Sequence, residues 1–212
     1  MTYLVGYSPH KEDTCALELA CLLARTEGDS VHAVTVVPRA WETSAGHEDG
    51  DFASWARAEG EASAKEALAM LAEHPEVESR ATWVTARSVP AAIMEQAESL
   101  DATAIVVGSG LEGLSGRITL TAKTDRLLHS SKVPVAIAPR GFLPRPDARV
   151  TRLTFAYRDD DSHHLLDDLA ARALGIGATI RLITIALKRP AMVTSGIRDA
   201  EAVVFERLIE QA

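Results

Sequence analysis

Short apolar runs alternate with longer segments of helical periodicity along the first 140 residues. Between the runs, apolar residues such as Cys15, Leu19, Leu22 and Leu23 recur every three or four positions, which is typical of an amphipathic helix. This alternation predicts an α/β fold with five parallel strands, in which helices connect each strand to the next. The expected strands cover residues 3–7, 31–37, 80–86, 104–107 and 133–138.

The composition of each run predicts its place in the sheet. Residues 80–86 alternate polar and apolar positions, as edge strands do, whereas residues 104–107 are apolar on both faces and therefore central. Pro134 cannot donate to a neighbouring strand, which places the last run at the other edge. With right-handed crossovers, we expect a doubly wound, Rossmann-like sheet of order 3-2-1-4-5. A crevice then opens between strands one and four, lined by residues 6–9 and 108–111.

The strand and helix pattern begins again after a proline-containing stretch. A strand over residues 153–157, a helical stripe over 166–174 and a strand over 180–186 repeat the order of the first elements. A final helix over 198–211 would complete a β-α-β-α fragment, which lacks counterparts of the last three strands. We interpret this fragment as a shortened second copy of a tandem protein; the alternative is a half-domain that packs on the first copy or on another molecule. The expected domains are 1–140 and 152–212, with a linker over 141–151.

Composition and charge narrow the class of protein. The 212 residues are 47% hydrophobic and 25% charged, which is ordinary for a globular chain. The formal charge of −8 disfavours nucleic acid as a partner. No run of about 18 apolar residues occurs, so we expect a cytoplasmic protein without a membrane partner. Cys15 and Cys21 lie six positions apart on different faces of one helix, which predicts buried thiols without a bridge.

The end of the fourth strand carries the candidate chemistry. Val107 is followed by Gly108, Ser109 and Gly110. A glycine-rich turn at the carboxyl end of a parallel strand can point backbone N–H groups at an anion near the next helix. The segment therefore predicts a phosphate site at the switch point of the sheet.

Three blocks of sequence form a further pattern: Val-Val-Gly-Ser at 106–109, Leu-Leu-His-Ser-Ser at 127–131 and Val-Pro-Val at 133–135. Together they resemble the universal stress protein family, in its tandem form. The resemblance implies a Rossmann-like fold and adenine nucleotide binding, of ATP or AMP, through the motif GxxGx(9)G(S/T) and an Asp after the first strand. Gly108 matches the first glycine of that motif. Other residues stand at the remaining positions: Ser8 at the Asp, Leu111 and Thr121 at the second and third glycines, and Ala122 at the Ser/Thr.

These departures predict that ATP binding in the usual mode is weakened or lost. Leu111 and Thr121 place side chains where the backbone would approach phosphate, and a positive φ would be costly for both. A shifted nest is an alternative, built from Gly110, Gly113 and Gly116 with the polar partners Ser109, Ser115, Arg117 and Lys123. The full candidate site is Gly6, Ser8, Val36, Val107, Gly108, Ser109, Gly110, Leu111, Thr121, Ala122 and Lys123.

We expect a non-catalytic stress-response module that acts through dimerisation or protein contacts. No Gly-x-Ser-x-Gly elbow, HExxH or Walker lysine appears, so no enzyme activity and no certain cofactor are expected. The edge strand at 133–138 predicts a homodimer. An adenine-nucleotide-binding switch, with a small nucleotide as partner, is the alternative function.

Three further sites carry residues that could bind a metal or a ligand, and each also has a simpler structural explanation. His163 and His164 follow an acidic run, where capping of a helix is favoured over a metal site. His10 is expected to be exposed at a helix start rather than bound to a ligand. Trp41 fits a lid over a ligand and a surface contact equally well.

Overall fold

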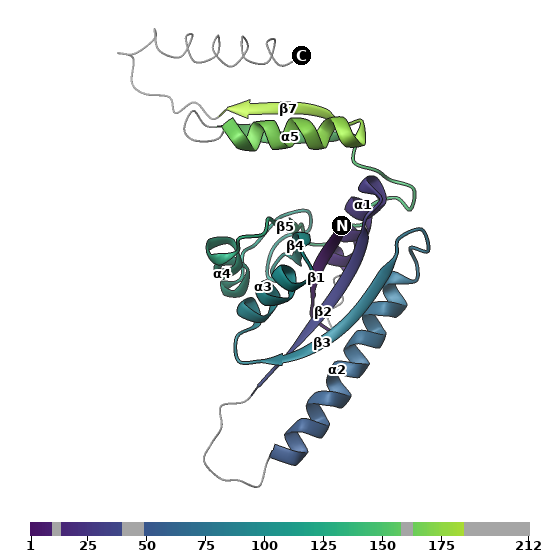
Figure 1. Ribbon diagram of the computed structural model, residues 1–212, viewed down its shortest axis with the longest axis vertical. Coiled ribbons are helices and arrows are strands. Elements are labelled where there is room, and N and C mark those ends of the chain that lie inside the picture. Colours follow the sequence, from purple (N-terminus) through teal and green to yellow (C-terminus); the bar gives the residue numbers. More distant parts are fainter. Residues whose placement is uncertain (10–13, 40–48, 158–162, 185–212) are drawn as a thin grey trace, which may run out of the picture. The chain divides into compact units, whose positions relative to one another are not determined.

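The computed structural model describes residues 1–9, 14–39, 49–157 and 163–184, and the chain forms two compact units, Met1–Arg149 and Val150–Ala212. The first unit holds a five-stranded parallel sheet of order β3-β2-β1-β4-β5, as the sequence predicts (Figure 1). Pairing is in register from Thr2↔Ser30 to Tyr7↔Thr35 between β1 and β2. The strands are β1 (Thr2–Tyr7), β2 (Ser30–Pro38), β3 (Ser79–Ala86), β4 (Ala102–Gly108) and β5 (Val135–Ala138).

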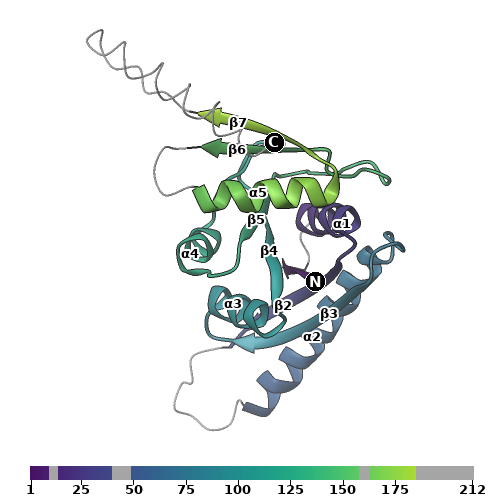
Figure 2. The same ribbon diagram turned by 45° about the horizontal axis from the view of Figure 1, so that its top comes forward.

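Four helices cover the two faces of this sheet. They are α1 (Cys15–Glu27), α2 (Asp49–Leu71), α3 (Val89–Ser99) and α4 (Ala122–Ser130). One buried cluster joins α1 and α2 to the sheet, and a second joins α3 and α4 to the opposite face (Figure 2). Helix α1 ends at Gly28, whose φ of 77° is left-handed and whose N–H donates to the Ala24 carbonyl at 2.8 Å.

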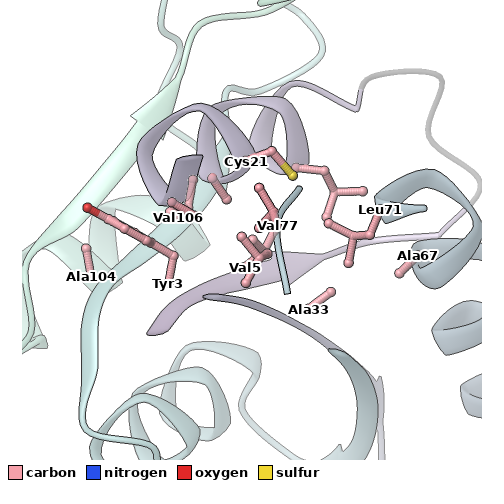
Figure 3. Packing of buried hydrophobic residues seen from close by; sticks show 13 residues of the cluster. Tyr3, Val5, Cys21, Ala33, Ala67, Leu71, Val77, Ala104 and Val106 are labelled. Atoms are coloured by element: carbon pink, nitrogen blue, oxygen red, sulfur yellow. The ribbon is translucent and has the colours of Figure 1, made fainter. Parts of the chain in front are cut away.

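The core between α1, α2 and the sheet consists of small and branched apolar side chains (Figure 3). Tyr3, Val5 and Val106 come from the two central strands and are fully buried. Cys21 packs among them, Cys15 is also buried, and neither forms a disulfide, so both predictions for the cysteines are confirmed. Burial, with a smaller effect of nearby Glu18, raises the pKa of the Cys21 thiol to about 12.

Helix α2 lies directly against β3 because one of its residues has no side chain. A Cβ added at Gly60 would lie 2.1 Å from Cδ2 of Trp83, so the indole occupies the space that any other residue would need. This contact brings α2 close to the sheet along β3 (Figure 1).

The second unit contains β6 (Arg152–Tyr157), α5 (His163–Ile176) and β7 (Thr179–Thr184), with β6 and β7 paired in parallel. Its order matches the first three elements of the β-α-β-α fragment that the sequence predicts, and Gly177 ends α5 with a φ of 66° as Gly28 ends α1. The expected helix over 198–211 and the side chains of His163 and His164 lie outside the described residues.

Residues 141–149, part of the expected linker, group with the first unit. Arg25 of α1 explains part of this grouping, because its Nη1 donates to the Ala148 carbonyl at 3.2 Å. The Arg149 guanidinium in turn donates to the Arg25 carbonyl. Arg25 also contacts Glu76, and its Nη2 lies 3.0 Å from Nδ1 of His74. A buried arginine therefore ties α1 to two later segments of the chain.

Candidate functional site

A cavity of about 430 Å³ opens at the carboxyl ends of β1, β2 and β4. This volume falls within the range of about 300–1,000 Å³ that small-molecule sites occupy. Gly110 and Ala122 do not contribute to its wall. The other nine candidate residues do: Gly6, Ser8, Val36, Val107, Gly108, Ser109, Leu111, Thr121 and Lys123.

The cavity exists where strands end in residues without side chains. A Cβ at Gly6 would lie 3.0 Å from Cδ1 of Ile93, and a Cβ at Gly108 would lie 3.1 Å from Sγ of Cys15. Both glycines therefore allow helices on the two faces to approach the ends of β1 and β4. Their positions serve helix packing as well as access to the crevice.

The loop after β4 is folded on its own polar groups. The Ser109 hydroxyl accepts a hydrogen bond from the Thr119 N–H at 2.7 Å, and the Gly110 N–H donates to the Thr119 carbonyl at 2.8 Å. The Ser109 N–H donates to the Ala138 carbonyl of β5 at 3.0 Å. These bonds join the two ends of the loop and attach its start to the sheet.

Arg140, just after β5, holds the middle of the same loop. Its Nη1 donates to the carbonyls of Leu111 and Gly113, the latter at 2.6 Å. Its backbone carbonyl accepts from the Gly116 N–H at 2.9 Å. The Gly113 N–H turns back to the Gly110 carbonyl at 3.4 Å. The amides of Gly110, Gly113 and Gly116 are thus all bonded within this region, and the shifted nest considered from the sequence is not assembled.

Leu111 and Thr121 fit the loop without the positive φ that would be costly for them. Within the described residues, Asp101 is the only non-glycine residue with a positive φ. Thr121 has a φ of −86° and is the N-cap of α4, where its hydroxyl accepts from the Thr124 N–H at 3.2 Å. Leu111 is 43% exposed. Both positions therefore carry a side chain where the family motif has glycine.

The inner wall of the cavity includes a polar residue that the sequence analysis missed. Thr35 of β2 is 4% exposed, and within the described chain its Oγ1 is the buried side-chain atom that lacks a hydrogen-bond partner. Tyr7, its neighbour on β1, donates its hydroxyl to Oε1 of Glu66 at 2.5 Å. Burial, followed by this glutamate, raises the pKa of Tyr7. A hydroxyl between two valines, Val34 and Val36, was the available signal in the sequence.

The rim of the cavity combines an aromatic ring with two opposite charges. Trp55 and Glu59 of α2 line one side, and Trp55 is 52% exposed. Lys123, in the first turn of α4, lines the side next to the glycine loop. Among the described residues, Glu59 and Lys123 are the charged side chains of this wall. His10 and Trp41, the other aromatic candidates, lie outside the described part of the chain.

A second hollow lies at the opposite, amino end of the strands. It encloses about 660 Å³ and is bordered by Arg25, Asp29, Glu76, Glu78 and Arg149, among others. These charges include bonded pairs: Arg25 contacts Glu76, and Asp29 lies 3.3 Å from the terminal amine of Met1. In the portion of the chain that the structure describes, no three His, Cys, Asp or Glu side chains gather into a metal site, and no helix has the length and apolar character to cross a membrane.

Comparison with known proteins finds similar sequences and structures. Universal stress protein Rv2319c of Mycobacterium tuberculosis (strain ATCC 25618 / H37Rv) is 36% identical over 218 residues, covering 100% of this chain and 74% of the relative. A solved protein of the universal stress protein family from Burkholderia pseudomallei covers 65% of this chain and 95% of its own, with 21% identity and a TM-score of 0.51. Protein PA1789 from Pseudomonas aeruginosa PAO1, described as functionally unknown, covers 99% of this chain and 67% of its own, with 16% identity and a TM-score of 0.54.

The two solved structures are less than 25% identical to this chain and show only that the fold is shared. The sequence comparisons also identify the family. A model of the universal stress protein family matches residues 1–139, which is the part of the chain that carries the five-stranded sheet and the cavity. Together with the 36% identity to the mycobacterial relative, this match shows that the chain belongs to the universal stress protein family.

Proposed function

We propose that this protein is a non-catalytic stress-response module whose cavity takes a ligand of nucleoside size and does not clamp a triphosphate. The main support is that an open cavity of about 430 Å³ lies beside a glycine-rich loop whose backbone amides already donate hydrogen bonds within the protein. The cavity offers apolar walls and an aromatic rim to a ring system. The loop offers little to the β- and γ-phosphates.

Three features of the loop support the loss of the triphosphate clamp. The side chains of Leu111 and Thr121 replace hydrogen atoms at the two missing glycines, so phosphate oxygens cannot reach the backbone closely. Ala122 supplies no hydroxyl at the first turn of α4. The amides of Gly110 and Gly116 already donate within the loop and to Arg140. Lys123 lines the cavity and supplies the positive charge that a single phosphate would need.

Titration calorimetry of the full chain with adenosine, AMP and Mg-ATP tests this proposal. We expect adenosine and AMP to bind, and ATP to bind within about threefold of AMP, which corresponds to well under 1.4 kcal/mol. A triple variant that restores the motif, Leu111→Gly with Thr121→Gly and Ala122→Ser, should bind ATP at least about tenfold more tightly than the wild type. Wild-type binding of ATP that is tenfold tighter than AMP would overturn the loss of the clamp.

The absence of catalysis is tested on the same samples. The cavity wall presents Glu59 and Lys123 on opposite sides, and a hydrolytic site would need a nucleophile and base within hydrogen-bond reach of each other. Incubation with ATP and AMP should release no phosphate or ADP above the buffer rate. Turnover that a Lys123→Ala variant abolishes would contradict a purely binding role.

The free edge of β5 supports the second part of the proposal, a homodimer. In the described chain β5 pairs with β4 alone. The Ile105 N–H donates to the Pro134 carbonyl and the Ser109 N–H donates to the Ala138 carbonyl, so even-numbered residues of β5 face β4. The N–H and C=O groups of Val135 and Ile137 therefore face outward, where a second copy could pair with them.

This geometry selects the variant for the dimer test. Proline at Ala136 would break the ladder to β4, whereas proline at Ile137 removes an outward N–H. Ile137→Ala loses the same side-chain contacts but keeps the N–H, and serves as the matched control. We expect dimeric wild type and Ile137→Ala and monomeric Ile137→Pro in sedimentation velocity. A dimer that persists in Ile137→Pro would exclude this edge. The cytoplasmic location and the absence of a nucleic-acid partner stay predictions.

A further inference from the structure

The inner wall of the cavity carries a hydroxyl that is buried and unpaired. Thr35 is 4% exposed, and its Oγ1 makes no hydrogen bond to the described residues. Buried polar atoms in folded proteins are nearly always bonded to protein, water or ligand, because an unpaired one loses the hydrogen bonds that it makes in the unfolded chain. The missing partner of Thr35 is therefore expected from the cavity that it lines.

The neighbouring strands do not supply that partner. In the sheet register Thr35 stands between Tyr7 of β1 and Trp83 of β3. The Tyr7 hydroxyl is committed to Glu66, and the Trp83 indole packs against the backbone of Gly60. Both flanking side chains are thus fixed by contacts with α2, which leaves the hydroxyl of Thr35 between them.

The polarity of the cavity wall changes from the β2 side to the α4 side. Val34, Val36 and Val37 of β2 line the cavity together with Thr35, with Val34 and Val36 on the opposite face of the strand from Thr35. Lys123, the cationic member of the described wall, stands in the first turn of α4 beside the glycine loop. A ligand with an anionic end and an uncharged ring would place the anion toward Lys123 and the ring toward β2.

We propose that Thr35 recognises the ligand by a hydrogen bond from its hydroxyl to the polar edge of a nucleobase. This inference rests on the proposed function, since it assigns a ring-reading residue to the same cavity. A hydroxyl both donates and accepts, and therefore matches either the N–H groups or the ring nitrogens of a heteroaromatic edge. One uncharged hydroxyl is unsuited to a phosphate, which needs several donors or a positive charge.

Two variants of Thr35 separate recognition from packing. Thr35→Val keeps the shape and removes the hydroxyl, whereas Thr35→Ser keeps the hydroxyl and removes a methyl group. In calorimetric titration of the full chain with adenosine, we expect Thr35→Val to bind about tenfold more weakly than the wild type. Thr35→Ser should stay within about threefold of the wild type.

The melting temperature of the ligand-free variants separates the two roles. If Thr35 only supported the packing of the core, its replacement would lower the melting temperature. Removing a buried, unpaired hydroxyl should raise the melting temperature of Thr35→Val by a few degrees, roughly, while its adenosine-induced shift shrinks. A stabilised variant that binds more weakly supports recognition by the hydroxyl. A variant that loses both stability and binding, with Thr35→Ser equally impaired, would overturn it.

The remaining outcomes distinguish this inference from the proposed function. Wild type that binds adenosine while Thr35→Val binds equally well would remove Thr35 from recognition and leave the nucleoside-binding module intact. Wild type that binds neither adenosine, AMP nor ATP would overturn the proposed function, and with it the role of Thr35.

Discussion

Replacing Gly60 by alanine tests the closest contact between helix α2 and the sheet. In a helix interior, glycine to alanine ordinarily stabilises by about 1 kcal/mol, because alanine restricts the unfolded chain. At this position the new Cβ would lie 2.1 Å from Cδ2 and 2.5 Å from both Cγ and Cε3 of the Trp83 ring. Carbon atoms at rest are about 3.5–4.0 Å apart, so the helix or the indole must move by more than about 1 Å.

The expected outcome is a loss of stability in spite of the better helix propensity. Overpacking of a well-packed core typically costs about 1–3 kcal/mol, and a ring held between helix and strand has little room to yield. After the propensity gain, we expect Gly60→Ala to lower the free energy of unfolding by about 1–2 kcal/mol. For a unit of roughly 150 residues this lowers the melting temperature by about 2–8 °C.

Urea unfolding followed by tryptophan fluorescence measures the change, since Trp41, Trp55 and Trp83 all belong to the first unit. Trp83→Leu in the Gly60→Ala background should recover part of the loss, with a coupling of at least about 1 kcal/mol in a double-mutant cycle. Gly175→Ala in α5 is the matched control, because an added Cβ there meets nothing within 4 Å. Circular dichroism should show it neutral or stabilising.

Two results would refute this reasoning. Gly60→Ala that is more stable than the wild type would mean that the indole gives way freely and that propensity dominates. An equal loss with and without the Trp83 indole would assign the damage to some other contact of α2.

Four further predictions concern ionisable groups. Arg25→Met should destabilise the first unit by about 2 kcal/mol, because it leaves the Nδ1 of His74 without the donor it faces; equilibrium unfolding measures it. A backbone hydrogen bond first, and then Arg25, lower the pKa of Glu76 below 4.5. The stabilisation that Glu76 contributes is therefore present above pH 4.5 and is lost as the pH falls through the lowered pKa. This loss should be smaller in Arg25→Met. Cys21, buried with a pKa of about 12, should react with a disulfide reagent at pH 8 only after urea is added; rapid reaction of the native protein would contradict its burial. Burial lowers the pKa of His32 below 6.5, so stability should decrease as pH falls below 6.5, and a His32→Gln variant should lack that slope in pH-dependent melting.

The order of the sheet could be predicted because each strand carries local evidence of its place. Residues 104–107 are apolar on both faces and form part of β4, which is paired on both sides. Pro134 precedes β5, which is an edge. Gly28 marked the end of α1 through its tolerance of a left-handed φ. An apolar run, a proline that lacks an N–H donor and a glycine that ends a helix are all visible in short stretches of sequence. They can therefore be interpreted without knowledge of tertiary contacts.

The interior of the site could not be predicted in the same way. Thr35 matters because Tyr7 and Trp83, which come from two other strands, are committed to α2, and no local pattern around residue 35 contains that fact. Arg140 holds the loop through carbonyls 27 and 29 positions earlier in the chain. The mouth of the cavity depends on strand ends and was predicted, whereas its inner contacts depend on register and packing.

The backbone conformation of the loop bears on the two glycines that the family motif has and this chain lacks. Thr121 adopts a φ of −86°, outside the left-handed region that favours glycine, and caps α4 with its own hydroxyl. An N-cap changed from threonine to glycine costs only a few tenths of a kcal/mol, so the triple variant that restores the motif should fold like the wild type. Its affinity for ATP then reports the removal of side chains and the addition of one hydroxyl at residue 122, without a compensating change in loop strain. If that affinity does not rise, the barrier to triphosphate lies in the internal bonds of Gly110 and Gly116 and in the carbonyls held by Arg140, rather than in Leu111 and Thr121.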